Sequence, residues 1–545
     1  MAVDGFSRDA RLPRLVVIAA ALVSIALKAA NVSVGAPQFM IDDFSLYEGG
    51  FLVWFGQAPP QHAFIECWLC GLSSFACFAV RALWAGHRLT SAEGYFVAGA
   101  LRDFYNAPDA YYATYRSLLI AVDALTAFFV WKLARRTLAD VWTAAWATAL
   151  FLFTYNALWC ALVGRPDTLM TCAATAGLYL YVRSDAVRSR PAFWWAAICM
   201  GLAAGLKMHG GLLTIFAVVD LLRRHGLRAG LRPAFAFAAT AFVVFLAADG
   251  SLLYDPLVYV KARVSTYHDD ASPYLHWGHQ FLVILRTTAW VIAPLAIAGA
   301  AALRRDGAAP RALRTLAVFG LGWLAVFALT RPLRGYWMLS AAPVLYILAA
   351  SALDRLRQPW VRGTVMAAIA AVMMTETAAL SWQTSHTDTG GLRAWVGTTV
   401  KPGERFYIVG DAILRLPKNT DTMRLYKAAY EREMESDLAG GRPFVERHLK
   451  NWEEQAQLRL FDMLGYRNDG GHAFYSYRDM PPQKYGDLVP LARMDYLVVQ
   501  ERFPVDDVPG LKSLLATGFC YIGERRAEGG DGRGLTVRIY RRSSS

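Results

Sequence analysis

Long apolar segments dominate this sequence and restrict the folds that are open to it. They follow one another from the N-terminus to about residue 380, each roughly 17–22 residues long, and short clusters of Arg and Lys separate them. A helix of this length crosses the hydrocarbon core of a bilayer and satisfies its own backbone hydrogen bonds there. The sequence therefore predicts an α-helical membrane protein with many spans.

The basic clusters test the number of spans, because connections rich in Arg and Lys tend to stay on the cytoplasmic side. The clusters "KLARR", "RSDAVRSR", "LLRRHGLRAGLR", "LRRDGAAPRALR" and "LDRLRQPWVR" each come after an even number of crossings if there are eleven spans. The N-terminus is then cytoplasmic and everything after about residue 381 is extracytoplasmic. The eleven predicted spans are 14–31, 116–134, 139–155, 168–183, 193–207, 211–222, 233–249, 281–302, 313–330, 337–352 and 362–380.

The segment 63–84 is also apolar enough to cross a membrane. Counting it as one crossing would invert every later loop and contradict the charge distribution. We therefore predict that it is a helix at the outer interface, or a re-entrant one. Residues 32–115 then form one long first outer loop within a transmembrane domain that covers 1–384.

Residues 385–545 have a different composition, with many charges and with Gly and Pro between short apolar runs. Four runs resemble strands, and a helix-like stretch of about 18 residues separates the first two of them. This pattern predicts an extracytoplasmic α/β domain with a mixed sheet. The predicted strands are 405–410, 495–500, 519–527 and 535–542.

The net charge of +13 does not indicate nucleic acid, because the basic residues lie mostly in the connections between apolar segments. Cys67 and Cys70 form a CxxC pair, but no second pair accompanies it, so neither a metal site nor a redox site is predicted there. The first apolar segment is too long for a signal peptide and lacks a cleavage pattern, so we expect an uncleaved first span.

Two adjacent acids, Asp42 and Asp43, stand in the first outer loop about a dozen residues after the first span. One interpretation is that they cap a helix that begins in "FSLYEGGFLVWF". The other is that they belong to a reaction centre, because further polar residues are expected at the same membrane face.

Arg165 and Asp167 lie where the third span ends and the fourth begins, and Lys207 and His209 lie between the fifth and the sixth. An ion pair or a helix cap explains the first two residues, and snorkelling explains the lysine. Charged residues at this depth are nevertheless candidates for a functional site.

Arg331, Arg334 and Tyr336 precede or begin the tenth span on the outer side, against the usual charge asymmetry. An anionic ligand at that face would account for these arginines. The loop 250–280 adds His268 and Asp269, which either support the site or belong to an ordinary polar loop. We expect no required cofactor, and a divalent metal bound in this loop is the alternative.

A carboxylate pair and several cations on one face suit the transfer of a group from a lipid phosphate. A cation stabilises the departing phosphate, and a carboxylate deprotonates the attacking hydroxyl or amine. Collected in order along the chain, "IDDFSLYEGG", "GRPDTLM", "GLAAGLKMHGGLL" and "RGYWMLSAAPVL" resemble motifs of the GT-C superfamily of integral membrane glycosyltransferases. The resemblance is to the branch with the protein O-mannosyltransferases and the lipid A aminoarabinose transferase, and it covers about 12–380.

This resemblance implies roles for individual residues. Asp42 matches the catalytic base, and Asp43 stands where many members have Glu. Lys207 would contact the donor phosphate. Arg334 with Tyr336 would help to hold the lipid carrier or close the site. Asp167 matches a second acidic position that binds the acceptor or orients Lys207. Apart from the resemblance, the expected position at the same face makes Arg331 a candidate for carrier binding, and it makes candidates for acceptor binding or support of Arg165, His209, His268 and Asp269.

The resemblance further implies an inverting glycosyltransferase of the bacterial inner membrane, with its site on the outer face. The expected partners are a polyprenyl-phosphate-linked sugar, membrane lipids, and a glycan, lipid or protein acceptor. Two alternatives remain. An O-antigen ligase or polymerase would carry its key residues in a late outer loop, and a lipid-linked sugar flippase or transporter would carry charges deep within its spans.

Overall fold

The computed structural model describes most of the chain. It covers residues 11–32, 41–54, 64–85, 99–100, 103–104, 108–185, 189–250, 282–286, 288, 290–305, 310–329, 335–356, 358–386, 391–401, 403–410, 412–414, 416, 418–439, 472–477, 480–529 and 534–543.

The chain divides into two compact units. The first comprises Met1–Val32, His62–Glu66 and Tyr115–Ser385. The second comprises Ser33–Gln61, Cys67–Thr114 and His386–Ser545. The predicted first outer loop is thus grouped for the most part with the C-terminal segment.

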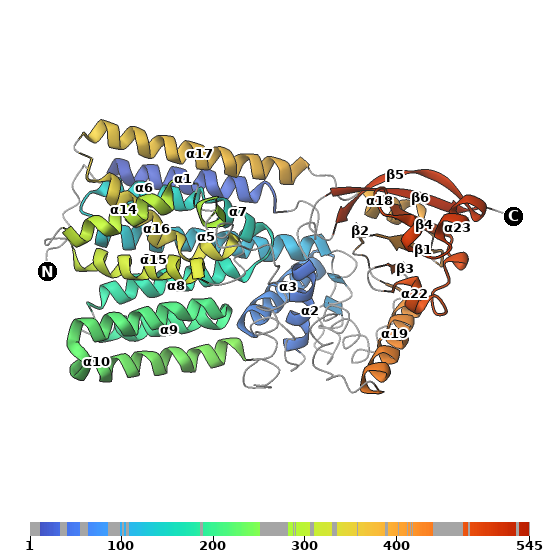
Figure 1. Cartoon of the computed structure of the whole chain (residues 1–545), viewed down its shortest axis with the longest axis horizontal. Helices are drawn as coiled ribbons and strands as arrows, with labels where there is room; N and C mark the ends of the chain where they lie inside the picture. The colour runs from blue at the N-terminus through green and yellow to red at the C-terminus, as the bar shows by residue number, and fades with distance from the viewer. Residues whose placement is uncertain are drawn as a thin grey trace. The chain divides into compact units, whose positions relative to one another are not determined.

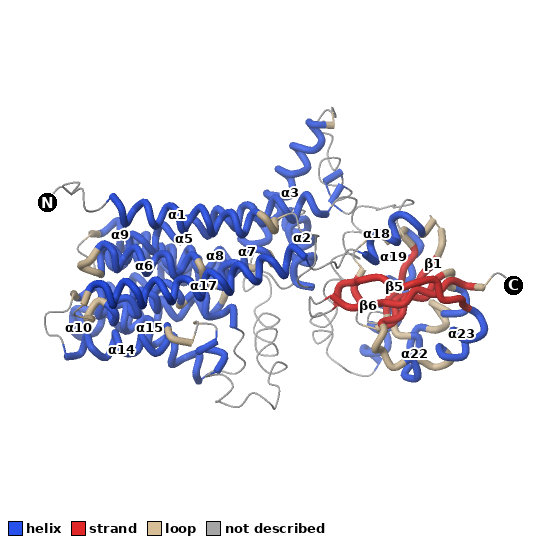
Figure 2. Tube along the Cα trace, turned by 90° about the horizontal axis from the view of Figure 1, so that it is seen from above, coloured by secondary structure: helices blue, strands red, loops and turns tan. Residues whose placement is uncertain are grey.

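The first unit is a bundle of helices that run side by side (Figures 1 and 2). Each of the eleven predicted spans overlaps a helix in the described part of the chain. Six described helices are long and apolar enough to cross a membrane, and one bent pair would add a seventh, so the chain is a multi-pass membrane protein. The bundle is built from α1 (Arg11–Ala29), α5 (Pro108–Thr137), α6 (Val141–Leu152), α7 (Tyr155–Leu162), α8 (Pro166–Arg183), α9 (Arg190–Leu206), α10 (Leu212–Asp249), α14 (Ile292–Arg305), α15 (Arg311–Leu329), α16 (Ala342–Leu353) and α17 (Pro359–His386).

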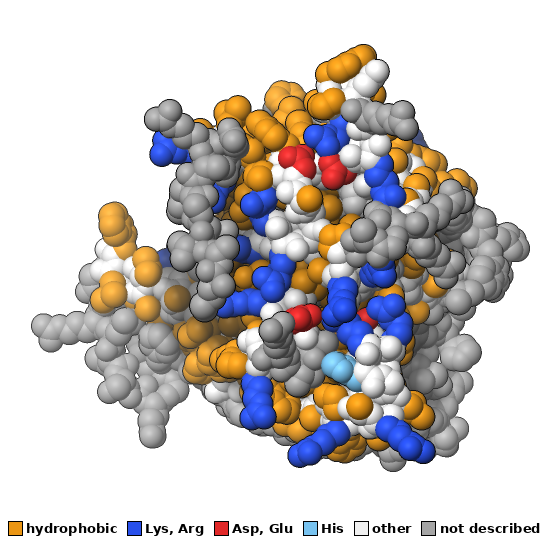
Figure 3. All heavy atoms as spheres, turned by 90° about the vertical axis from the view of Figure 1, so that its left-hand side faces the viewer, with side chains coloured by type: hydrophobic (Ala, Val, Ile, Leu, Met, Phe, Trp, Pro, Cys, Tyr) orange, Lys and Arg blue, Asp and Glu red, His pale blue; other side chains and the backbone are white. Residues whose placement is uncertain are grey.

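Basic residues gather at one end of this bundle, as Figure 3 shows for the end that faces the viewer. Arg135 and Arg136 lie in the last turn of α5, and Arg183 in the last turn of α8. Arg190 begins α9 and Arg311 begins α15. The described basic residues thus share one end of the bundle, as the predicted sidedness requires.

The predicted span 139–155 is bent rather than straight. Helices α6 and α7 meet at an angle of 44°. No Gly or Pro marks this position, and neighbouring helices instead satisfy the backbone groups that the break releases. Ser24 of α1 donates to the Leu152 carbonyl at 2.8 Å, and Thr377 of α17 donates to the Phe153 carbonyl at 2.8 Å.

In the second unit, α2 (Ile41–Trp54) packs against α3 (Phe64–Trp84) so closely that the Gly50 backbone reaches that of Gly71. The predicted helix over 63–84 is confirmed, and α3 is also one of the six helices with the length and hydropathy of a span. Arg81 near its C-terminal end forms a bidentate ion pair with Asp103, at 2.7 and 3.1 Å.

The C-terminal part of the second unit is a six-stranded mixed sheet in the order β2-β5-β6-β4-β1-β3. Strand β1 pairs in parallel with β3 and β4, and β6 pairs antiparallel with β4 and β5. The four predicted strands are confirmed, and two strands, β2 and β3, had not been predicted. The strands are β1 (Arg405–Val409), β2 (Ala412–Ile413), β3 (Ala473–Ser476), β4 (Tyr496–Gln500), β5 (Phe519–Gly529) and β6 (Gly534–Arg542).

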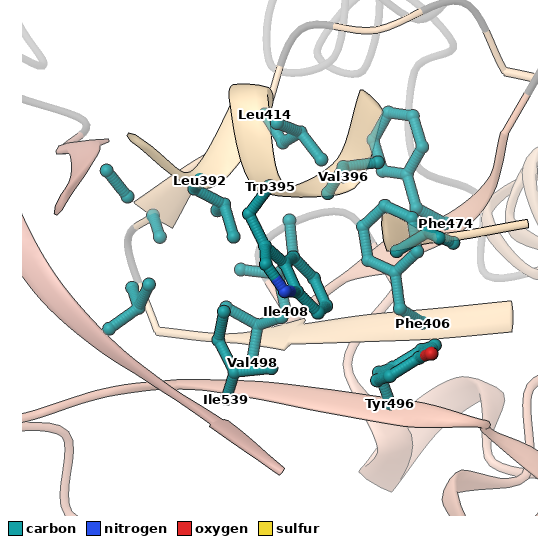
Figure 4. Packing of buried hydrophobic residues seen from close by; sticks show 14 residues of the cluster. Leu392, Trp395, Val396, Phe406, Ile408, Leu414, Phe474, Tyr496, Val498 and Ile539 are labelled. Atoms are coloured by element: carbon teal, nitrogen blue, oxygen red, sulfur yellow. The ribbon is translucent and has the colours of Figure 1, made fainter. Parts of the chain in front are cut away.

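Apolar cores cover both faces of the sheet. On one face, Trp395 and Val396 of α18 (Gly391–Thr399) pack with Ile408, Val498 and Ile539 (Figure 4). The other core includes side chains from α19 (Thr420–Ala439), α22 (Pro482–Tyr485) and α23 (Leu511–Gly518). The predicted helix-like stretch is confirmed as α19.

Candidate functional site

The first component of the candidate site is the sharp turn between α7 and α8. The amide of Arg165 donates to the Cys160 carbonyl at 3.1 Å, which closes a Schellman motif around Gly164. Gly164 has φ +73°, a conformation that L-residues with a Cβ adopt only under strain. Arg165 then caps α8, and Pro166 with its fixed φ begins the helix. This turn places Asp167 in the first turn of α8.

The second component is the end of α9. Lys207 follows the last helical residue with an extended backbone, φ −152° and ψ 131°, and the short 3-10 helix η2 (Met208–Gly211) comes next. Gly210 lies against the end of α9, because a Cβ there would be 2.3 Å from the Ala203 carbonyl oxygen. The small residues of "GLAAGLKMHGG" thus let η2 fold back and fix where Lys207 leaves the helix.

The two components meet in an ion pair. The Lys207 Nζ lies 2.6 Å from the Asp167 Oδ2, although the residues are 40 positions apart. Each charge also suits its helix end, because a carboxylate is stabilised at an N-terminus and an ammonium at a C-terminus. The Asp167 side chain is fully buried, whereas 18% of the Lys207 side chain is exposed. The lysine is therefore the more accessible member of the pair, and the carboxylate is the sealed one.

The second carboxylate oxygen of Asp167, Oδ1, is sealed from solvent and has no hydrogen-bond partner among the described residues. The atom is inaccessible to solvent, so a substrate does not touch it in this conformation. The sequence left two roles open for Asp167, acceptor binding and the orientation of Lys207. A carboxylate in this position suits the second role.

His209 lies in η2, two residues beyond Lys207. Its ring makes edge-to-face contacts with Phe327 and Trp323 of α15, with centroid distances of 5.9 and 6.4 Å. These contacts anchor η2 to α15 and so support the backbone that carries Lys207. His209 therefore takes a packing position next to Lys207.

The remaining predicted residues are placed to different degrees. Asp42 and Asp43 lie in the first turn of α2, inside the helix rather than before it. Tyr336 belongs to the 3-10 helix η3 (Gly335–Ser340), which packs against α7 and α8, the helices on either side of the Arg165 turn. The side chains of these three residues lie outside the described part of the structure, as do Arg331, Arg334, His268 and Asp269.

A buried charged pair within the bundle was not predicted from the sequence. Lys28 of α1 forms a salt bridge with Asp123 of α5, and both residues are almost fully buried. A signal was present, because each stands inside a predicted span and ionisable residues there are uncommon.

No group of three or more His, Cys, Asp or Glu side chains suited to a metal ion occurs in the regions that the structure describes. The loop 250–280, where the metal alternative was placed, lies outside these regions except for Gly250.

Comparison with known proteins identifies the fold. No family model matches the chain, and no curated protein matches it in sequence. The crystal structure of ArnT from Cupriavidus metallidurans in the apo state matches with a TM-score of 0.52 and 13% identity, over 96% of this chain and 97% of that one. The ArnT structure bound to undecaprenyl phosphate matches with a TM-score of 0.53 and 12% identity, over the same shares. The chain therefore has a GT-C fold, and the resemblance predicted from the sequence is confirmed at the level of the fold.

Proposed function

We propose that this chain is an inverting glycosyltransferase that moves a sugar from a polyprenyl-phosphate donor to a glycan, lipid or protein acceptor. The observation that carries the proposal is the Lys207–Asp167 pair, which holds a partly exposed lysine side chain at the end of α9 within a GT-C fold. ArnT, which has a similar fold, binds undecaprenyl phosphate, and this supports a lipid phosphate as the ligand here. We place the reaction at the outer face of a bacterial inner membrane, with the C-terminal sheet domain on the same side.

Charge development defines the role of Lys207. In the reaction the bond between the anomeric carbon and the phosphate oxygen breaks, and the phosphate gains negative charge as it leaves. An ammonium held in advance at that oxygen lowers the barrier, because its orientation is already fixed by Asp167. Arg334, Tyr336 and Arg331 hold the carrier in this proposal, and Arg165 lies at the turn next to the pair.

The acceptor attacks from the opposite side of the sugar, which inverts the anomeric carbon. Asp42 takes the proton from the attacking hydroxyl or amine as the new bond forms, and Asp43 supports it. Both acids lie in the first turn of α2. The proposed reaction includes no redox step and uses no cofactor.

The experiment uses the full chain in nanodiscs, a panel of synthetic polyprenyl-phosphate sugars, and undecaprenyl phosphate as the binding probe. Lys207→Ala is expected to weaken lipid-phosphate binding and to abolish transfer, and Lys207→Arg to restore binding in part. Asp42→Asn is expected to bind the donor normally but to lose turnover by a factor of about 100 or more, as expected for the loss of a general base.

The matched control is Lys132→Ala, which removes an exposed lysine that stands over the Phe128 ring in α5. It should leave both binding and transfer unchanged. Equal losses in Lys207→Ala and Lys132→Ala would contradict the role of Lys207, and full turnover in Asp42→Asn would exclude Asp42 as the base. Lipid translocation without sugar transfer would instead favour the flippase alternative, which the buried Lys28–Asp123 pair also suits.

A further inference from the structure

The outer third of α1 buries polar side chains where an ordinary span buries apolar ones. Most of the long apolar side chains of this helix face outward, among them Leu12, Leu15 and Leu22. Towards its C-terminal end, the buried positions are instead Ser24 and Lys28. Burial of charge and hydroxyl inside a membrane protein is unfavourable unless each group finds a partner.

Each of these side chains has a partner on a different helix. Lys28 forms its salt bridge with Asp123 of α5 and also donates to the Ser24 hydroxyl at 3.0 Å. Ser24 in turn donates to the carbonyl of Leu152, the last residue of α6. The polar cluster therefore joins α1 to α5 and to the bend between α6 and α7.

Two further contacts hold the residues that follow α1. The Asn31 amide donates to the Ser381 hydroxyl of α17 at 2.6 Å. The guanidinium of Arg116, from α5, donates to the Val32 carbonyl at 3.3 Å. The path of the chain is thus fixed up to Val32, nine positions before α2 begins at Ile41.

A salt bridge fixes position in a way that apolar packing does not. Apolar side chains can repack when a helix rotates or shifts, whereas a buried ammonium and carboxylate then lose their interaction. Apolar side chains of similar volume would hold α1 in the bundle about as firmly. What the pair adds is therefore a single allowed register for the outer end of α1.

We infer that Lys28 and Asp123 are positioning residues. They fix the exit of α1 within the helical bundle, in the geometry that sugar transfer needs. Through Ser24 the same pair supports the bend after α6, and α7 leads from that bend to the turn that presents Asp167. Only the expected effect on sugar transfer rests on the proposed function.

The experiment replaces the pair by apolar residues of similar size in the full chain. Lys28→Met and Asp123→Leu alone each leave an unpaired buried charge, and both are expected to lower the Tm. The double variant, Lys28→Met with Asp123→Leu, is expected to recover most of the Tm. Hydrogen exchange at 29–32 and across α7 should nevertheless be faster by about tenfold in the double variant, since local opening no longer breaks the salt bridge.

Transfer gives the second readout. The double variant is expected to lose kcat by about 10- to 100-fold, the range expected for a displacement near 1 Å, although its Tm is largely recovered. A merely structural role would restore kcat together with the Tm.

The matched control is the pair at the basic end of the bundle, Asp220 and Arg224 of α10. Their Oδ2 and Nε lie 2.6 Å apart, and the Asp220 side chain is fully buried. Asp220→Leu with Arg224→Met should leave kcat and the exchange at 29–32 and in α7 at wild-type values. Unchanged exchange at 29–32 and in α7 of the Lys28/Asp123 double variant would overturn the inference, and so would equal losses in the control. If the wild type transfers no sugar, the proposed function fails, and hydrogen exchange still decides whether the pair fixes the exit of α1.

Discussion

Gly210 provides a prediction that the structure makes quantitative. The residue lies in η2, three positions beyond Lys207, and a Cβ built on it would be 2.3 Å from the Ala203 carbonyl oxygen and 2.5 Å from its carbon. Both atoms belong to the backbone of α9, so no side-chain rotation relieves the clash. Ordinary contact begins at 3.4 Å. Gly210→Ala therefore requires η2 to move by about 1 Å, and overpacking of this kind destabilises a protein by about 1–3 kcal/mol.

The neighbouring Gly211 is the matched control. A Cβ there would meet only the Ala204 Cβ, at 3.7 Å, and the backbone conformation is ordinary, with φ −63°. Gly211→Ala is thus accommodated without movement. Because Gly→Ala lowers the entropy of the unfolded chain, the change should be neutral or stabilising by about 0.4–1 kcal/mol.

The assay compares the two alanine variants in nanodiscs by thermal unfolding and by binding of undecaprenyl phosphate. Gly210→Ala should lower the Tm and weaken binding, because the displacement of η2 carries the Lys207 ammonium away from Asp167. If sugar transfer is established, kcat should fall by up to about 100-fold, since catalysis depends on placement within about 1 Å. The reasoning is refuted if Gly210→Ala matches Gly211→Ala in both measurements.

Three further outcomes follow from the described contacts. Asp167→Asn should destabilise the chain by about 2–3 kcal/mol, somewhat less than the loss of one partner from a fully buried pair, because Lys207 is partly exposed. Thermal unfolding checks this, and an unchanged Tm would contradict the pairing. Thr377→Val leaves the buried Phe153 carbonyl without its donor, and should cost about 1–3 kcal/mol in the same assay, whereas a neutral result would show that another group satisfies the bend. Burial lowers the pKa of His472 in the sheet domain below its usual 6.5, so the unfolded chain takes up the proton first and stability falls as the pH drops below about 6.5. The loss between pH 7.5 and 5.5, measured by thermal unfolding, should be smaller in His472→Gln, and an equal loss would contradict the assignment.

The helical part of the fold was accessible from the sequence, because lipid imposes a simple rule. A segment that crosses a bilayer must be long, apolar and helical, and these properties are local. The basic clusters added sidedness, and their shared end in the structure agrees with it. The bend between α6 and α7 was not accessible, since it depends on hydroxyl groups of α1 and α17 rather than on Gly or Pro at the break.

In the sheet domain, too, some elements could be predicted from the sequence and others depend on tertiary contacts. Strands β1, β4, β5 and β6 were predicted from runs of apolar and β-branched residues with clear boundaries. Strand β3 was missed because its four residues, "AFYS", are too few to show a period. It is a strand because it pairs in parallel with β1, a contact between segments more than 60 residues apart.

The sequence by itself determined the class of this protein, the order and approximate ends of its helices, and the kinds of side chain available at the outer face. The tertiary structure decided which of those side chains act together. Asp167 faces Lys207 because α8 and α9 pack with their outer ends level, and Lys28 meets Asp123 because α1 has one rotation and register against α5. Rotation and register are set by packing between helices, and a local pattern of residues does not contain them.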